Sequence, residues 1–414
     1  MANIPEHPPK KAPIRLEYLR ERRRKRKIRL GIGITVVLAG VLFYITGLYG
    51  ASMALLIDSM DTVAMTLTPG VGWPSKTGMS SVVDAKPIDG GFIVLGEDDL
   101  MLYSDNGNQL RSIQHGFARP SVSVGKTRFC LYSRTGTELR VENRSRTLYT
   151  KNFDQAILAA EIAQNNSVAV LTRSARYTGE LIVYDREFAE IFHWYATDSE
   201  GTPYLLSFSD NSKDIAVACL ASSGGVLGLN IELLNVTKSE PIATISLQNC
   251  KGYQIKWVDS ETLFVLTDQY CALYDKTGAE KAKYSYVGKS LQTADVQNGT
   301  AALLFENGEL LILDVRNGAL KQTAQTSFVN ASMVSVANKG VCVVVDHTVH
   351  MLGLDGETQY SRTFQWEPVG IVNAKQLMIL YGSEVDVLST EDSKNDHAAS
   401  SDSAEEPSST GDEE

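Results

Sequence analysis

A unit of about 40 residues recurs through the middle of the chain, and this period constrains the fold more than any other feature. Each unit holds a short aliphatic run, a turn, and a second run that ends in a polar turn. One anchor residue can be chosen in the second run of each unit: Tyr103, Val141, Tyr184, Leu234, Tyr274, Leu313, Leu354 and Val387. Successive anchors are 33 to 50 residues apart. Four short strands per unit at this period are typical of a β-propeller, an all-β fold.

The first run of each unit is β-branched or aliphatic throughout, as at residues 92–95, 168–171 and 341–345. Continuous apolar runs of this length are typical of strands that are buried on both faces. We therefore expect these runs to form the inner strands of the blades, and alternating runs to form the outer strands. Eight anchors predict eight blades, with seven blades or two stacked β-sandwiches as alternatives.

The last unit supplies only three strands before the chain turns polar: residues 369–372, 376–381 and 384–388. An open blade edge would expose unpaired backbone groups. In residues 62–68, Val63, Met65 and Leu67 alternate with polar residues and one alanine, a pattern that suits a half-buried outer strand. We therefore predict that residues 62–68 complete the final blade and close the ring.

A stretch of 28 residues without a charge, from Leu30 to Ile57, precedes the repeats. Its most apolar part is long enough to cross a hydrocarbon core of about 30 Å as a helix. Residues 1–30 contain 11 Lys or Arg residues and only three acidic ones, and basic flanks stay on the cytoplasmic side. The sequence thus predicts a single-pass cell-membrane anchor, with the N-terminus in the cytoplasm and the repeats outside it. A cleaved signal peptide is the alternative.

These observations divide the chain into five parts. They are a basic cytoplasmic arm (1–29), a transmembrane anchor (30–50), a short stalk (51–61), a β-propeller (62–388) and a disordered acidic tail (389–414). The basic cluster before the anchor can contact anionic lipid headgroups, and comprises Arg22, Arg23, Arg24, Lys25, Arg26 and Lys27. The formal net charge of the chain is -10, and no motif supports nucleic-acid binding.

Side chains that could carry out chemistry are few and scattered. Asp98, Asp99, Asp210 and Asp214 form two carboxylate pairs in expected hairpin turns, where Asp is common. The close pair His347 and His350 has the spacing of a turn between strands and not that of a helical metal site. The sequence has no phosphate-binding loop, nucleophile elbow or calcium-binding loop. Catalytic residues therefore stay unassigned, and we expect no cofactor or metal.

The five cysteines are odd in number and include no CxxC motif. Cys130, Cys219 and Cys342 lie within apolar runs, where cysteine behaves as a small hydrophobic residue. A disulfide between Cys250 and Cys271 within one blade is the alternative for the remaining two.

Several motifs resemble known repeat families. The segment FSDNSKDIAV at residues 208–217 is similar to the start of a WD-like blade, with Asp210 and Ser212 where Pro and Gly are usual. LYDKTG (273–278) and LDVRNG (313–318) resemble turns of pyrroloquinoline-quinone-like repeats, although the Trp that closes such repeats is missing.

The overall layout also resembles a family of uncharacterised, membrane-anchored propeller proteins of Gram-positive bacteria, known as a domain of unknown function. The matching features are the basic arm, the anchor, PGVGWPSKTG (69–78) and QHGFARP (114–120), which opens the second blade. The resemblance covers most of residues 20–388. It implies an anchored propeller and no activity.

Two classes of function fit these observations. The leading hypothesis is a non-enzymatic, membrane-tethered interaction platform that holds an envelope protein on one rim. The alternative is a propeller enzyme or a small-ligand sensor that uses the central channel. A contiguous apolar patch on the rim would favour the platform, and polar side chains converging on the channel from several blades would favour the alternative.

Overall fold

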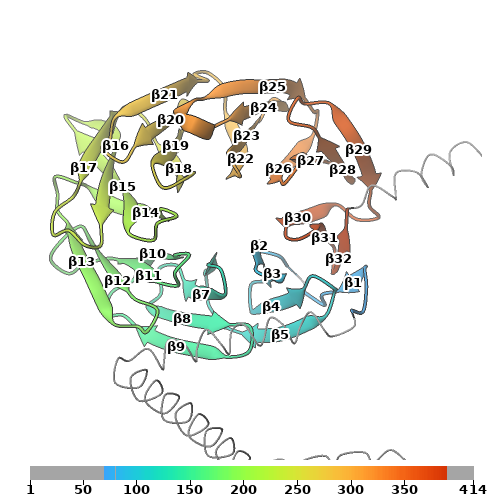
Figure 1. Cartoon of the computed structure of the whole chain (residues 1–414), viewed down its shortest axis with the longest axis horizontal. Coiled ribbons are helices and arrows are strands. Elements are labelled where there is room, and N and C mark those ends of the chain that lie inside the picture. Colours follow the sequence, from blue (N-terminus) through green and yellow to red (C-terminus); the bar gives the residue numbers. More distant parts are fainter. Residues whose placement is uncertain (1–69, 80, 389–414) are drawn as a thin grey trace, which may run out of the picture. The chain divides into compact units, whose positions relative to one another are not determined.

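Eight four-stranded antiparallel sheets make up the part of the chain that the computed structural model describes, residues 70–79 and 81–388. Figure 1 shows these sheets as blades arranged in a ring, and a cavity lined by inner strands lies in the central channel of the ring. The prediction of an all-β propeller with eight blades is confirmed, and the alternatives of seven blades and of stacked sandwiches are wrong. In each blade the inner strand lies at the channel, followed outward by the second, third and outer strands.

Blades 1 to 4 follow the chain order from the inner strand outward. Blade 1 consists of β2 (Asp84–Ile88), β3 (Gly91–Leu95), β4 (Asp99–Ser104) and β5 (Gln109–Gln114), and blade 2 of β6 (Pro120–Val124), β7 (Arg128–Ser133), β8 (Glu138–Asn143) and β9 (Thr147–Asn152). Blade 3 consists of β10 (Ile157–Ile162), β11 (Val168–Thr172), β12 (Gly179–Tyr184) and β13 (Glu190–Ala196), and blade 4 of β14 (Thr202–Phe208), β15 (Asp214–Ser223), β16 (Val226–Asn235) and β17 (Ala243–Gln248).

Blades 5 to 7 repeat this arrangement, and blade 8 takes its outer strand from the start of the described chain. Blade 5 consists of β18 (Gly252–Trp257), β19 (Thr262–Thr267), β20 (Tyr270–Asp275) and β21 (Glu280–Ser285), and blade 6 of β22 (Leu291–Gln297), β23 (Thr300–Phe305), β24 (Glu309–Asp314) and β25 (Lys321–Ser327). Blade 7 consists of β26 (Ala331–Ala337), β27 (Gly340–Val345), β28 (Thr348–Leu352) and β29 (Thr358–Thr363), and blade 8 of β30 (Pro368–Asn373), β31 (Leu377–Tyr381), β32 (Glu384–Val387) and β1 (Ser75–Lys76). A 3-10 helix, η1 (Arg316–Gly318), separates β24 from β25.

The continuous apolar runs form the second strand of each blade, and not the inner strand that the sequence pattern indicates. Strands β3, β11 and β19 are buried along their whole length. A second strand has hydrogen-bonded neighbours at both edges and a neighbouring blade on each face, whereas an inner strand has one edge at the channel. Strand β2 is therefore mostly half-buried, although it lies nearest the channel.

Apolar side chains between neighbouring blades form eight separate core clusters, one at each boundary of the ring. The cluster between blades 1 and 2, for example, contains Ile93 and Phe129. The cluster between blades 8 and 1 contains Phe92, Tyr103 and Leu380, so the last blade packs against the first. Each blade thus buries both of its faces against its neighbours, which stabilises the ring.

The ring is closed by β1, a two-residue strand near the start of the described chain. Ser75 pairs with Val385 and Lys76 pairs with Glu384, which makes β1 the outer strand of blade 8. The three strands predicted for this blade are confirmed as β30, β31 and β32. The outer position, which the sequence pattern assigns to residues 62–68, is filled by β1 instead, and residues 62–68 lie outside the described residues. A strand of two residues shows no alternation, so its pattern could not reveal it.

The two faces of the ring differ in the loops that they carry. All inner strands begin at one face, called here the upper face, which also carries the links between blades and the turns between second and third strands. The other turns lie at the lower face. The described chain starts at the lower face, where the Gly72 N–H donates to the Asn106 carbonyl oxygen at 3.3 Å, and β32 also ends there. Neither end of the described chain lies on the upper face.

The predicted arm, anchor, stalk and tail lie outside the described residues, so their boundaries at residues 1–29, 30–50, 51–61 and 389–414 stay predictions. Within residues 70–79 and 81–388, no helix has the length and apolar character needed to cross a membrane.

Candidate functional site

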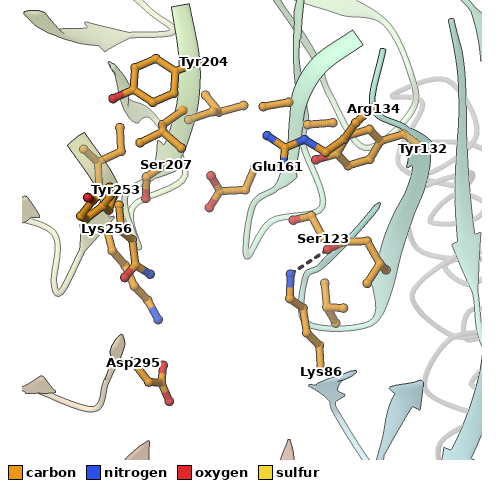
Figure 2. A pocket seen from close by; sticks show the side chains of 18 of the residues that line it. Lys86, Ser123, Tyr132, Arg134, Glu161, Tyr204, Ser207, Tyr253, Lys256 and Asp295 are labelled. Atoms are coloured by element: carbon orange, nitrogen blue, oxygen red, sulfur yellow. Dashed lines mark hydrogen bonds between the residues drawn. The ribbon is translucent and has the colours of Figure 1, made fainter. Parts of the chain in front are cut away.

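A polar cavity of about 560 Å³ occupies the channel and is lined mainly by the inner strands of blades 1 to 6. Figure 2 shows Lys86, Glu161, Lys256 and Asp295 around this cavity, each from a different blade. Arg134, just after β7, is the remaining charged residue of the lining. No histidine or cysteine from the described part of the chain lines the cavity.

The four charged residues that line the cavity from inner strands share one position in the repeat. The position is defined by the second strand of the blade. The first buried apolar side chain of the second strand lies at or near its start, and the ring position pairs with the residue that follows it. Lys86 thus pairs with Ile93, and Glu161 pairs with Ala169. We call the eight residues at this position the ring residues: Lys86, Ser123, Glu161, Ser207, Lys256, Asp295, Ser335 and Ile371.

Several ring residues accept a hydrogen bond from the backbone of the next blade. The Ser123 hydroxyl accepts a hydrogen bond from the Ile162 N–H at 3.1 Å, and the Ser207 hydroxyl accepts one from the Trp257 N–H at 3.3 Å. In each case the donor is the residue directly after the ring residue of the next blade. Asp295 follows the same rule, because its Oδ2 accepts the Val336 N–H at 2.8 Å.

The two lysines of the ring reach the next blade as donors. The Lys86 ammonium donates to the Val122 carbonyl oxygen at 2.8 Å and pairs with the Asp84 carboxylate at 3.0 Å. The Lys256 ammonium donates to the carbonyl oxygen of Val296. These contacts join blades 1 and 2 and blades 5 and 6, so most polar ring residues contribute to cohesion between blades.

The boundary between blades 8 and 1 explains the one apolar ring residue. The residue after Lys86, which would act as the donor there, is Pro87, and proline has no N–H. The ring residue of blade 8 is Ile371, which has no acceptor. A residue without an acceptor thus lies at the one boundary where the next blade offers no donor at this position, so neither residue loses a hydrogen-bond partner.

Glu161 differs from the other ring residues in its electrostatics. Burial raises the pKa of its carboxyl to about 7, although a backbone hydrogen bond from Phe208 and the charges of Lys86 and Lys256 act in the opposite direction. Burial also lowers the pKa of the Lys256 ammonium, against the attraction of Asp295 and Glu161. A carboxyl with a pKa near 7 can exchange a proton at neutral pH, and it can pair with a cation.

The residues singled out from the sequence lie away from this cavity. Asp98 and Asp210 lie in turns, and Asp99 and Asp214 begin β4 and β15, so the expected hairpin turns are confirmed. Asp214 holds its turn together by accepting from the side-chain amides of Asn211 and Asn235.

The two histidines and the cysteines also have structural positions. His347 lies in the turn between β27 and β28, whereas His350 lies within β28, beside Phe328. Within the described ranges, no three His, Cys, Asp or Glu side chains are grouped as a metal site would require. All five cysteines are buried and free, and the alternative of a Cys250–Cys271 disulfide is wrong.

Large apolar side chains are exposed mainly at the upper face. Of the 14 such residues in the described chain, 11 lie on its loops or at adjoining strand ends, whereas Val71, Ile191 and Leu354 do not. The 11 residues, called here the upper apolar set, are Val83, Tyr177, Tyr195, Leu220, Val226, Leu227, Tyr253, Val287, Val329, Trp366 and Val369. Two further cavities open among these loops, one of about 520 Å³ beside Tyr253 and one of about 550 Å³ beside Val329.

The sequence reasoning missed the ring residues, although a signal for them exists. In seven blades the ring residue is polar or charged, and in most blades a bulky apolar residue follows it just before the turn to the second strand, as in Glu161-Ile162 and Lys256-Trp257. An alignment of the repeats on the inner strand, and not on the third strand, places these polar residues at one common position.

A family model described as a family of unknown function (DUF5711) matches residues 71–389. No curated protein matches the sequence. The computationally designed protein Ika8 is similar in structure, with a TM-score of 0.59 and 10% identity over 76% of this chain and 99% of that chain.

Two natural proteins give comparable similarity. For Sqt1 of Saccharomyces cerevisiae the TM-score is 0.57, with 9% identity over 76% of this chain and 96% of that chain. For the C-terminal WD40 domain of Sif2 the TM-score is 0.55, with 13% identity over 77% of this chain and 99% of that chain. At these identities the similarity shows the propeller fold alone, and it supports the predicted likeness to WD repeats at the level of the fold.

Proposed function

The chain belongs to this family of unknown function, and we propose that it acts as a membrane-tethered platform that binds a protein partner outside the cytoplasm. The binding surface in this proposal is the upper face of the propeller. The tether is the apolar segment at residues 30–50, and the basic cluster Arg22 to Lys27 contacts anionic lipid on the cytoplasmic side.

The distribution of exposed apolar side chains is the observation that carries this proposal. Trp366, Val287 and Val329 are 58%, 69% and 78% exposed in links between blades, although such residues are normally buried. A tryptophan on a surface is a frequent anchor of protein–protein interfaces. The lower face exposes far fewer residues of this kind, so the asymmetry favours a partner on the upper face.

The chemistry of the channel supports a binding protein over an enzyme. Ser123, Ser207 and Asp295 each accept a hydrogen bond from the next blade, so their oxygens are engaged in holding the ring together. A serine nucleophile would need its oxygen available to a substrate, and the oxygens of both serines are already hydrogen-bonded to the neighbouring blade.

Site-specific photo-crosslinking in cells tests the proposal on the full-length chain. A photoreactive amino acid replaces Trp366 in one variant and Val329 in another, and mass spectrometry identifies any crosslinked protein. We expect the same partner to be captured from both positions, because both belong to the upper apolar set.

Leu354 is the matched control, because it is 38% exposed in a lower-face turn. The same substitution there should not capture that partner. Equal capture from Leu354 and Trp366 would contradict the assignment of the upper face. A C-terminal tag that resists protease added to intact cells would contradict the location outside the cytoplasm.

A further inference from the structure

The channel cavity presents charges of both signs on neighbouring parts of its wall. Lys86, Glu161 and Lys256 come from blades 1, 3 and 5, which are spaced around the ring two blades apart. Figure 2 shows their side chains around one open space. The Glu161 carboxyl interacts electrostatically with both lysines, so the three side chains form one electrostatic group.

Two of these side chains keep hydrogen-bonding capacity after their contacts with the next blade. A lysine ammonium has three N–H donors, and that of Lys256 gives one to the Val296 carbonyl oxygen. A carboxylate has two acceptor oxygens, and Glu161 takes one backbone N–H, from Phe208. Between them lies blade 4, whose ring residue Ser207 is engaged with the Trp257 N–H.

We propose that the channel binds a small zwitterion, an amino acid or a short peptide, whose ammonium group pairs with Glu161 and whose carboxylate pairs with Lys256. This site is independent of the partner surface on the upper face. A singly charged ligand would gain one ion pair and bring its charge toward a like charge two blades away. A ligand with both charges forms an ion pair with Glu161 and another with Lys256. The cavity of about 560 Å³ lies in the usual size range of small-molecule sites.

Asp295 does not compete for the ammonium group of the ligand. Its carboxylate accepts the Val336 N–H and the Ser335 hydroxyl, at 2.8 and 3.2 Å, and the side-chain amide of Gln297 lies at 3.2 Å. Glu161 is therefore the carboxylate of the channel with the greater capacity for a new partner.

Calorimetric titration of the purified full-length chain tests this inference with three related probes. L-alanyl-L-alanine carries both charges, its N-acetyl form lacks the ammonium group, and its C-terminal amide lacks the carboxylate. We expect the free dipeptide to bind, and each cap to weaken binding by about tenfold or more, because each removes one charge-assisted contact. Absence of binding by the free dipeptide, or equal binding of the capped forms, would overturn the proposal.

Two variants test which side chain contacts which end of the ligand. Glu161→Gln should bind the free and N-acetylated dipeptides equally and still discriminate against the amide. Lys256→Gln should show the reverse preference. Glu187→Gln, an exposed carboxylate in the β12–β13 turn, is the control and should bind as the natural protein does. If a variant fails to fold, the capped probes on the natural protein still decide the question.

Discussion

The Arg362 guanidinium of blade 7 donates to the Asp386 carboxylate of blade 8 at 2.6 Å. It also donates to the Val387 carbonyl oxygen at 2.9 Å, while the Asp386 carboxylate accepts the Val387 N–H at 2.8 Å. Strand β1 pairs only with Glu384 and Val385, so Val387 lies just beyond it. The ion pair thus covers the edge of β32 that the short closing strand leaves open, which protects it from pairing with another chain.

Replacing Arg362 with alanine should therefore destabilise the propeller. The variant leaves the buried Asp386 carboxylate without its cation and the Val387 carbonyl without its donor, and we expect a loss of about 2–4 kcal/mol in the free energy of unfolding. Urea denaturation followed by tryptophan fluorescence measures this loss. The control is Arg316→Ala, because the Arg316–Asp314 pair is exposed and should change the free energy by less than about 1 kcal/mol. Similar losses in both variants would show that the ion pair does not protect the edge.

A second prediction concerns the closing strand. A protein that starts at Met79 lacks β1 and also Trp73, which packs against Phe92 with ring centroids 5.9 Å apart. We expect it to lose at least about 2 kcal/mol of stability relative to a protein that starts at Gly70, because an apolar contact and an outer strand are both removed. Urea denaturation of the two proteins measures the difference.

The same experiment tests the assignment of residues 62–68. A protein that starts at residue 62 should unfold at the same urea concentration as one that starts at Gly70, since β1 is present in both. A clear gain from residues 62–68 would show that they add to the closure.

A third prediction follows from the raised pKa of Glu161. Its folded-state pKa of about 7 exceeds the ordinary value of 4.5, so the folded protein binds more protons between these two pH values than the unfolded chain does. The contribution of Glu161 to stability should therefore fall as the pH rises from about 4.5 to about 7, by up to about 3 kcal/mol. Denaturation of the natural protein and of Glu161→Gln at pH 5 and pH 8 checks this, because glutamine does not titrate. An equal change with pH in both proteins would contradict it.

A fourth prediction concerns the ring residues. Ser123→Ala removes the acceptor of the Ile162 N–H and should cost about 1–2 kcal/mol in the free energy of unfolding. In contrast, Ile371→Ser should bring no gain, because Pro87 offers no N–H across the boundary between blades 8 and 1. Urea denaturation of the two variants measures both effects, and a stabilising Ile371→Ser would show that the serine finds another donor.

The architecture could be predicted from the sequence because its signals repeat. The third-strand anchors recur once per blade, so small errors in their positions do not change the count of eight. In blade 7, for example, Leu352 and not the chosen Leu354 is equivalent to Tyr103 of blade 1. Both Leu352 and Tyr103 pair with the outer strand directly after a β-bulge. The apolar pattern indicates the wrong strand of the blade, because burial on both faces depends on neighbouring blades, which a single repeat does not reveal.

The polar position of the ring residues can be read from the repeats, but the meeting of these residues in one cavity cannot. Lys86 and Glu161 are 75 positions apart, and only the ring geometry brings them to one cavity. The same holds for closure, since the two residues of β1 have no pattern of their own and gain their role from Val385 and Glu384.

The pairing of Ser75 with Val385 joins positions 310 residues apart, so the order of synthesis matters for this fold. Seven blades can form as the chain emerges, because each consists of consecutive strands, but the eighth has to wait until β32 has been made. Closing so long a loop costs about 5 kcal/mol of chain entropy, which the cluster between blades 8 and 1 has to offset. A circular permutant that places β30 to β32 directly before β1 would turn this last step into a local one, and should fold faster without any new contact.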